Sequence, residues 1–235
     1  MNVLFQHQTL GDLMAGFFDG TLPLSELHKY GNTGIGTFHT FDGELTMLDG
    51  VIYQIKDTGE VTVADESMTT PYAAVADFKP DMEYKIERPI TLKKLRSVIT
   101  GMVRSKNVFS VIRIDGHYPF VQTRAVSPQT KPYPRLIEAA NGQEEFETFN
   151  VKGTAIGILT PDLFDGVSKG GFHCHFISDD RTFGGHIIDY IVDDATVQIQ
   201  TIDAIMQNFA TDHEEFMQGE INYHNLAEEM EIAEG

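Results

Sequence analysis

The sequence predicts a mixed α/β (α+β) fold in which mixed and antiparallel β-sheet is flanked by helices. Asp-Gly pairs separate short apolar runs between residues 34 and 65, which is the strongest short-range signal for β-hairpins. Residues 91–103 (TLKKLRSVITGMV), after Pro89, have the character of a helix. The second half of the chain returns to strand-like runs. The 235 residues suffice for one compact unit or two closely packed lobes.

The N-terminal half is predicted to begin with two short helices, followed by an antiparallel meander. Residues 9–18 (TLGDLMAGFF) carry apolar side chains at helical spacing after Thr9, which is suited to the N-cap. A second helix is expected at residues 24–29, ended by Gly31. The meander at 34–65 contains four apolar runs separated by turn residues: GIGTFHT, ELTML, VIYQI and EVTVAD.

Beyond the 91–103 helix, two further strands are expected at residues 107–116 and 119–126, joined by a turn at Gly116-His117. Three prolines between residues 128 and 134 then mark a junction between lobes. They divide the chain into residues 1–130, an α/β lobe, and 131–235, a β-rich lobe. The second lobe contains a short helical run, three strands and a charged, amphipathic tail expected to be helical: LIEAANG, FNVKGTAIGILTP, GGFHCHFIS, GHIIDYIVDDATVQIQ and residues 219–234.

The formal net charge is -18, from 17 Lys plus Arg against 35 Asp plus Glu. This field repels a nucleic-acid backbone or an anionic membrane surface, so neither is an expected partner. It serves solubility instead. An anionic substrate would require a local cation in its binding site.

A single cysteine, Cys174, excludes an internal disulfide and fits a reducing compartment. The N-terminal stretch has no basic region followed by an apolar run, as a signal peptide would have. No stretch reaches the roughly 18 uninterrupted apolar residues of a membrane span. A cytoplasmic protein is therefore expected.

The most informative local motif is HCHFISDDRTFGGH, residues 173–186. Alternate residues of a strand point to the same face, so His173 and His175 project together while Cys174 points away. The turn formers from 179 to 185 return the chain, and His186 opens the partner strand. Two histidines on a strand face alone would be read as surface or core residues. A third one placed by a hairpin favours a metal site, and three nitrogen ligands with open positions suit catalytic zinc.

The other histidines lack such partners and are read as structural or surface residues: His7, His28, His39, His117, His213 and His224. Glu44 follows the Asp42-Gly43 turn, and Arg124 lies in the otherwise uncharged strand FVQTRAV. Taken alone, a charged side chain in a strand is usually on the solvated face. Neither residue would be assigned a role on this ground.

Five segments carry a resemblance that runs from about Leu4 to Glu234: GNTGIGTFHTFDGEL, TPYA, IRIDGHY, TRAVSPQTKPYP and, above all, GGFHCHFISDDRTFGGHIIDY at residues 170–190. On these segments the chain resembles the bacterial acetolactate decarboxylases. The resemblance implies a zinc lyase that converts 2-acetolactate to (R)-acetoin and carbon dioxide. It also implies a two-lobed α/β protein with an extended sheet and a small β-barrel, commonly a homodimer.

The resemblance also implies roles for individual residues. The metal ligands fall on His173, His175 and His186, the conserved glutamate on Glu44 and the arginine on Arg124. A carboxylate near the C-terminus is best matched by Glu234, with three glutamates close by as alternatives: Glu228, Glu229 and Glu231. Under this reading the arginine orients the substrate carboxylate, and a glutamate gives a proton to carbon after carbon dioxide leaves.

Two other functions compete with this reading. A cupin-like metal-dependent oxygenase or isomerase acting on a small hydroxy-keto acid would use His173, His175 and Asp179 as ligands. Asp179 falls in the predicted turn, which disfavours it. A non-catalytic receptor for small hydroxy-keto acids would use the same pocket without turnover. Metal analysis, oxygen consumption and an acetoin assay separate the three.

Overall fold

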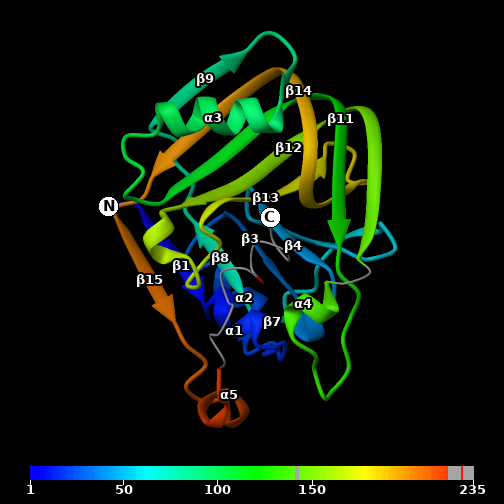
Figure 1. The fold of residues 1–235 in the computed structure, drawn as a ribbon, viewed down its shortest axis with the longest axis vertical. Helices are drawn as coiled ribbons and strands as arrows, with labels where there is room; N and C mark the ends of the chain where they lie inside the picture. The colour runs from blue at the N-terminus through cyan, green and yellow to red at the C-terminus, as the bar shows by residue number, and fades with distance from the viewer. Residues whose placement is uncertain (141–142, 222–228, 230–235) are drawn as a thin grey trace.

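The computed structural model describes residues 1–140, 143–221 and 229, in which two large β-sheets lie one against the other (Figure 1). A small third sheet pairs β2 (Leu22–Pro23) with β7 (Thr69–Thr70). Almost all strand pairs are antiparallel, and the helices are few and short. The predicted mixed α+β class is confirmed.

The larger sheet has seven short strands, all paired antiparallel except for the parallel pair β1–β15. Their spatial order is β15 (Ala204–Asn208), β1 (Val3–His7), β8 (Ala73–Ala76), β3 (Thr33–Thr37), β4 (Glu44–Leu48), β5 (Val51–Ile55) and β6 (Val61–Val63). The predicted meander at 34–65 is thus confirmed as β3 to β6. The β4–β5 turn forms at Asp49 and Gly50, whose φ angles of 51° and 83° are those of a hairpin turn with two left-handed residues.

The second sheet has longer strands, and its central member β14 pairs with four neighbours: β9, β10, β11 and β13. Its strands are β10 (Ile90–Thr91), β14 (Gly184–Thr201), β11 (Ser110–Ala125), β12 (Glu144–Thr160), β13 (Gly171–Ser178) and, beside β14, β9 (Met82–Ile86). The helix predicted at 91–103 is confirmed as α3 (Leu92–Met102), which covers this sheet at the upper end of Figure 1.

The predicted turn at Gly116-His117 is wrong, because β11 runs through it without a break. The strand pairs with β12 from Ser110↔Leu159 to Ala125↔Glu144. Its register against β14 shifts on either side of His117, which marks β-bulges. A side chain at Gly116 would lie 2.4 Å from Ala195 Cβ. The glycine therefore allows a close approach of two strands and does not make a turn.

The helix predicted at 9–18 forms over a shorter range, as α1 (Leu10–Met14). Thr9 Oγ1 accepts from the Asp12 amide at 3.1 Å, and Asp12 Oδ2 accepts from the Thr9 amide at 2.9 Å, which together make a capping box. Gly16, with φ at 93°, follows its end. The other short helices are α2 (Leu24–Leu27), α4 (Leu136–Ala139), α5 (Glu214–Gln218) and two 3₁₀ turns, η1 (His39–Phe41) and η2 (Asp162–Phe164).

The two sheets pack face to face through an apolar layer to which both contribute. The larger sheet supplies Leu4 and Ile35, and the second sheet supplies Val111, Ile156 and Ile177, all buried. Both sheets contain strands from either side of residue 130. The division at residue 130 and the β-barrel stay predictions.

Seven of the described strands were not predicted: β1, β8, β9 and β15, and the two-residue strands β2, β7 and β10. Of these, β1 and β8 are almost entirely buried on both faces, so they lack the alternation that marks a half-exposed strand. The helix predicted at 219–234 falls outside the described residues except at 219–221 and 229. Within the described part of the chain, no helix has the length and apolar character needed to cross a membrane.

Candidate metal centre

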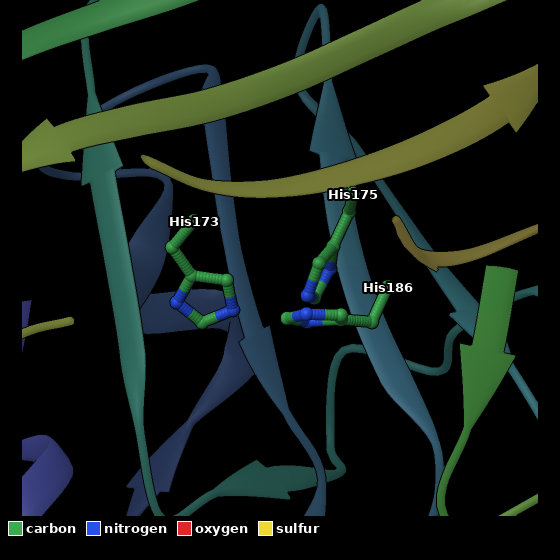
Figure 2. Close-up of side chains that lie close together, drawn as sticks. All are labelled: His173, His175 and His186. Carbon is green, nitrogen blue, oxygen red and sulfur yellow. The ribbon is translucent and has the colours of Figure 1, made fainter. Parts of the chain in front are cut away.

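Three histidine side chains from two neighbouring strands meet in the interior of the molecule (Figure 2). His173 and His175 lie on β13 and His186 lies on β14, where His175 and His186 are directly paired. One ring nitrogen of each lies within 4.8 Å of the others, and all three residues are buried. The structure therefore brings the predicted histidines together in an arrangement that can hold a metal ion.

The hairpin between the two strands is built by the residues between the histidines. The Ser178 amide donates to the Phe183 carbonyl oxygen at 2.8 Å, and Ser178 Oγ accepts from the Phe183 amide at 3.0 Å. Asp180 Oδ1 accepts from the Thr182 amide at 3.1 Å. These bonds fix the register that sets His186 opposite His175. Asp179, the ligand that a cupin-like site would need, is exposed in this turn.

The environment keeps the three imidazoles neutral. Burial lowers the pKa of His175 to about 4, and it lowers the pKa of His173 and His186 well below the usual value. The positive charge of Arg124 lowers all three further. Neutral imidazoles carry the free lone pairs that metal coordination requires.

One hydrogen bond fixes how His175 can coordinate. Its Nδ1 lies 2.8 Å from the carbonyl oxygen of Leu45, which can only accept, so Nδ1 carries the proton. Nε2 is then left with its lone pair facing the centre. A histidine that donates its second nitrogen to a backbone carbonyl is the usual form of a metal ligand. The donor set of this site thus fits a divalent cation such as zinc.

Glu44 and Arg124 lie beside the histidines. Glu44 is the first residue of β4 and is only 7% exposed, with Oε2 at 3.3 Å from His175 Nε2. Arg124 lies on β11, directly paired with His186. Arg124 and Lys169, which is buried, place positive charge near His173. These side chains supply the local positive charge that an anionic substrate would require in a protein of this net negative charge.

A cavity opens beside these groups. Its polar side is formed by the three histidines with Thr37, Glu44, Arg124 and Gln143, and its apolar side by Leu10, Leu13, Phe41, Tyr72 and Val126. Sequence reasoning missed the apolar side and the residues Thr37, Tyr72 and Gln143. Thr37 and Phe41 lie in the same GNTGIGTFHTFDGEL segment as Glu44, which was the available signal.

Glu234 lies outside the described residues, and so do Glu228 and Glu231. The neighbouring Glu229 is described, and its Oε2 lies 2.5 Å from Arg135 Nη2. The described histidines outside the centre pair with polar side chains elsewhere, as expected of structural or surface residues: His7, His28, His39, His117 and His213.

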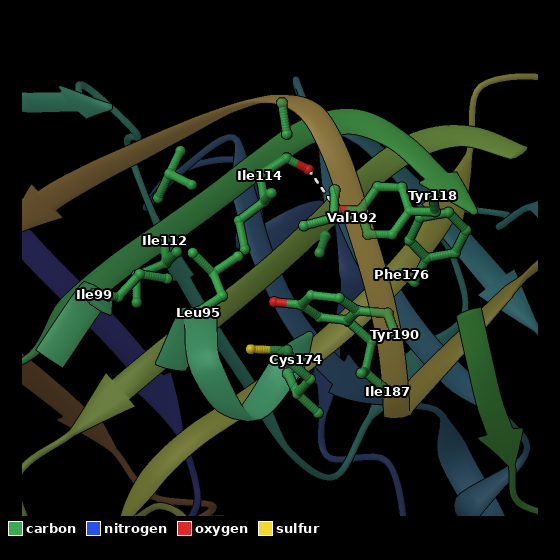
Figure 3. Close-up of a cluster of buried hydrophobic side chains, with 14 of the residues drawn as sticks. Leu95, Ile99, Ile112, Ile114, Tyr118, Cys174, Phe176, Ile187, Tyr190 and Val192 are labelled. Carbon is green, nitrogen blue, oxygen red and sulfur yellow. Dashed lines mark hydrogen bonds between the residues drawn. The ribbon is translucent and has the colours of Figure 1, made fainter. Parts of the chain in front are cut away.

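Cys174 faces away from the metal centre, as the alternation predicts. Its side chain lies in the apolar core between the second sheet and α3, beside Tyr190 and Leu95 (Figure 3). Burial raises the pKa of this thiol to about 11. We expect the native protein to show no reaction with a thiol reagent at neutral pH and the unfolded protein to react at one site. Rapid labelling of the native chain would contradict this placement.

Comparison with known proteins gives consistent matches over nearly the whole chain. The family model for alpha-acetolactate decarboxylase matches residues 4–223. The alpha-acetolactate decarboxylase of Lactococcus lactis subsp. cremoris is 38% identical over 231 residues, 98% of each chain. That of Bacillus subtilis is 37% identical, covering 99% of this chain and 91% of the relative.

Solved structures match equally well. The crystal structure of Bacillus subtilis alpha-acetolactate decarboxylase superposes with a TM-score of 0.96 at 37% identity, covering 99% of both chains. A Staphylococcus aureus protein of unknown function, described as similar to alpha-acetolactate decarboxylase, gives a TM-score of 0.97 at 37% identity, covering 99% of this chain and 100% of that chain.

Proposed function

The chain belongs to the alpha-acetolactate decarboxylase family and is a carboxy-lyase, and from this premise we propose that it uses one zinc ion to convert 2-acetolactate to (R)-acetoin and carbon dioxide. The observation that carries the proposal is the buried group of three neutral histidines beside Glu44 and Arg124 in one cavity. The same cavity has an apolar side that suits the methyl groups of this substrate.

His173, His175 and His186 would hold the ion. Three imidazole nitrogens, with no thiolate in the group, are the donor set of catalytic zinc sites, which keep positions open for substrate. When bound, the cation supplies Lewis-acid stabilisation of the negative charge that develops on the ketone oxygen as carbon dioxide departs. This chemistry makes an organic cofactor unnecessary.

Arg124 binds the carboxylate of the substrate. A planar guanidinium makes two parallel hydrogen bonds to a carboxylate, which fixes the orientation of the carbon–carbon bond that breaks. The register of β11 against β14 supports this role, because it pairs Arg124 with His186 and so holds the carboxylate next to the metal ligands.

Arg124→Lys is therefore expected to lower kcat/KM by at least about tenfold, equal to about 1.4 kcal/mol of transition-state stabilisation. Lysine keeps the charge but loses the two-pronged geometry. The measurement is steady-state acetoin formation, with zinc content determined on the same sample. An unchanged rate would mean that Arg124 does not orient the carboxylate.

Glu44 gives the proton to the carbon that has lost carbon dioxide. Its carboxyl group lies at the polar side of the cavity, in contact with His175, and it is shielded from solvent by burial. Delivery from one fixed side is what makes a single acetoin enantiomer. Glu234 is the second carboxylate that we propose for the site, where it would handle the proton of the substrate hydroxyl group.

Metal analysis coupled to an acetoin assay tests the proposal as a whole. We expect about one zinc per chain by mass spectrometry, and chiral gas chromatography should identify the product as (R)-acetoin. A chain that binds 2-acetolactate without turnover would be a receptor. Iron or manganese together with oxygen consumption would favour the cupin-like alternative.

We further propose that the protein is a cytoplasmic homodimer that binds neither nucleic acid nor membrane. Strand β15 supports the dimer, because it ends the seven-stranded sheet and carries Met206, 48% exposed. An edge strand of this kind can pair with a second copy. Light scattering after size-exclusion chromatography measures the mass, and a monomer at micromolar concentration would count against this part.

A further inference from the structure

Two stacked phenylalanine rings separate the catalytic cavity from a second cavity. Phe41 lines the first and Phe18 lines the second, and their centroids lie 4.9 Å apart with 11° between the ring planes. Both residues are buried. The second cavity lies toward α5 and is lined by Phe17 and Phe216, among others. The two rings therefore form a thin wall between the residues that line the two cavities.

The backbone fixes this wall in place. The Thr40 amide donates to the Phe18 carbonyl oxygen at 2.7 Å, and the Gln129 amide donates to the Thr40 carbonyl oxygen at 2.7 Å. Phe41 has a φ of 61°, in the left-handed region that non-glycine residues seldom adopt. Such a conformation persists only where its surroundings enforce it, and it commonly marks a functional site. The backbone that carries the ring of Phe41 is thus held in place beside the cavity that the histidines also line.

The polarity of the catalytic cavity determines which part of a ligand meets this wall. Oxygen atoms find partners at the histidines, Glu44 and Arg124, whereas alkyl groups face Phe41, Leu13 and Val126. We infer that Phe41, backed by Phe18, is the residue that sets the largest alkyl group accepted on the 2-hydroxy-3-keto acid substrate. The inference takes its substrate class from the proposed function.

The test compares 2-acetolactate with its homologue carrying ethyl in place of the 2-methyl group. One methylene in a closed apolar pocket changes kcat/KM by about 10- to 200-fold, so the wild-type protein should prefer the methyl substrate by about tenfold or more. Phe41→Ala opens the wall and should reduce this preference at least about tenfold. Because loss of a buried ring also destabilises a protein, Phe41→Leu provides a milder variant with the same expected direction.

Phe17→Ala is the matched control. Of the two cavities, Phe17 lines the second and not the first. Its ring packs edge-on against that of Phe216, with 5.7 Å between the ring centroids. Phe17→Ala also removes a phenylalanine ring, but from the second cavity. The ratio of kcat/KM for the methyl and ethyl substrates should therefore stay at the wild-type value. Equal ratios in wild type, Phe41→Ala and Phe41→Leu, with folded and active proteins, would overturn the inference.

Binding of unreactive analogues gives a readout that does not depend on turnover. The zinc-loaded protein is titrated by calorimetry with 2-hydroxy-2-methylpropanoate and its ethyl and propyl homologues. Affinity should fall with alkyl length in the wild type and not in Phe41→Ala. If this binding pattern is found but no acetoin forms, the proposed function is wrong and the inferred role of Phe41 is supported. If acetoin forms but binding to the wild type does not depend on alkyl length, the inferred role of Phe41 is wrong and the proposed function is supported.

Discussion

Replacement of His175 by alanine is expected to abolish metal binding and acetoin formation together. Two histidines would remain. The lost imidazole is the one whose Nδ1 donates to the Leu45 carbonyl oxygen and whose Nε2 lies beside Glu44. Zinc content should fall below about 0.1 per chain after dialysis, because two imidazoles make a weak site compared with three. The rate should fall to that of the uncatalysed reaction.

Thermal unfolding provides a second measurement of the same loss. A ligand that binds only the native state raises the free energy of unfolding, by about 4 kcal/mol at a ligand concentration 1,000 times its Kd. Tm rises as a result. Added zinc should therefore raise Tm in the wild type and leave His175→Ala unchanged. His28→Ala, a partly exposed histidine beside Glu66, is the matched control and should behave like the wild type. Full turnover by a protein from which chelation has removed all metal would defeat the metal assignment.

The histidine centre could be predicted from sequence because its geometry is local. Strand alternation places His173 and His175 on one face, and the short turn carries His186 back to them within one hairpin. The meander was predicted for the same reason, since Asp49-Gly50 encodes its turn directly. In each case the residues that determine the structure lie within a few positions of one another.

What sequence reasoning missed depends on contacts between distant segments. The wrong turn at Gly116 illustrates this, because the glycine meets Ala195 from another strand and no local pattern reveals that approach. The buried strand β1 lacks alternation because it is covered on both faces. Tyr72 and Phe41 adjoin strands of the larger sheet, yet they line one cavity with the histidines of the second sheet. The roles of Glu44 and Arg124 came from family resemblance, since a lone charge in a strand carries no local signal.

Glu44→Gln is expected to lower kcat by at least about 100-fold while zinc content and Tm stay near wild type. Glutamine has nearly the same shape as glutamic acid and can keep the contact with His175, but it has no proton to give to carbon. KM should change little, because the loss occurs only in the transition state. The measurement is single-turnover acetoin formation on zinc-loaded protein.

Two further variants separate proton delivery from metal binding. Glu44→Asp keeps a carboxylic acid, but its side chain is one methylene shorter. The carboxyl group would then lie farther from His175 Nε2 than the 3.3 Å of the wild type. The rate should therefore lie between those of wild type and Glu44→Gln. Glu234→Gln in the same assay tests whether the carboxylate of Glu234 also takes part in proton transfer.

If Glu44 delivers the proton, its loss should also lower the enantiomeric purity of acetoin, because water would then reach both faces of the carbon. Racemic product with a much reduced rate is thus the combined result expected of Glu44→Gln, whereas a slow but still enantiopure reaction would transfer the proton donor's role to another residue.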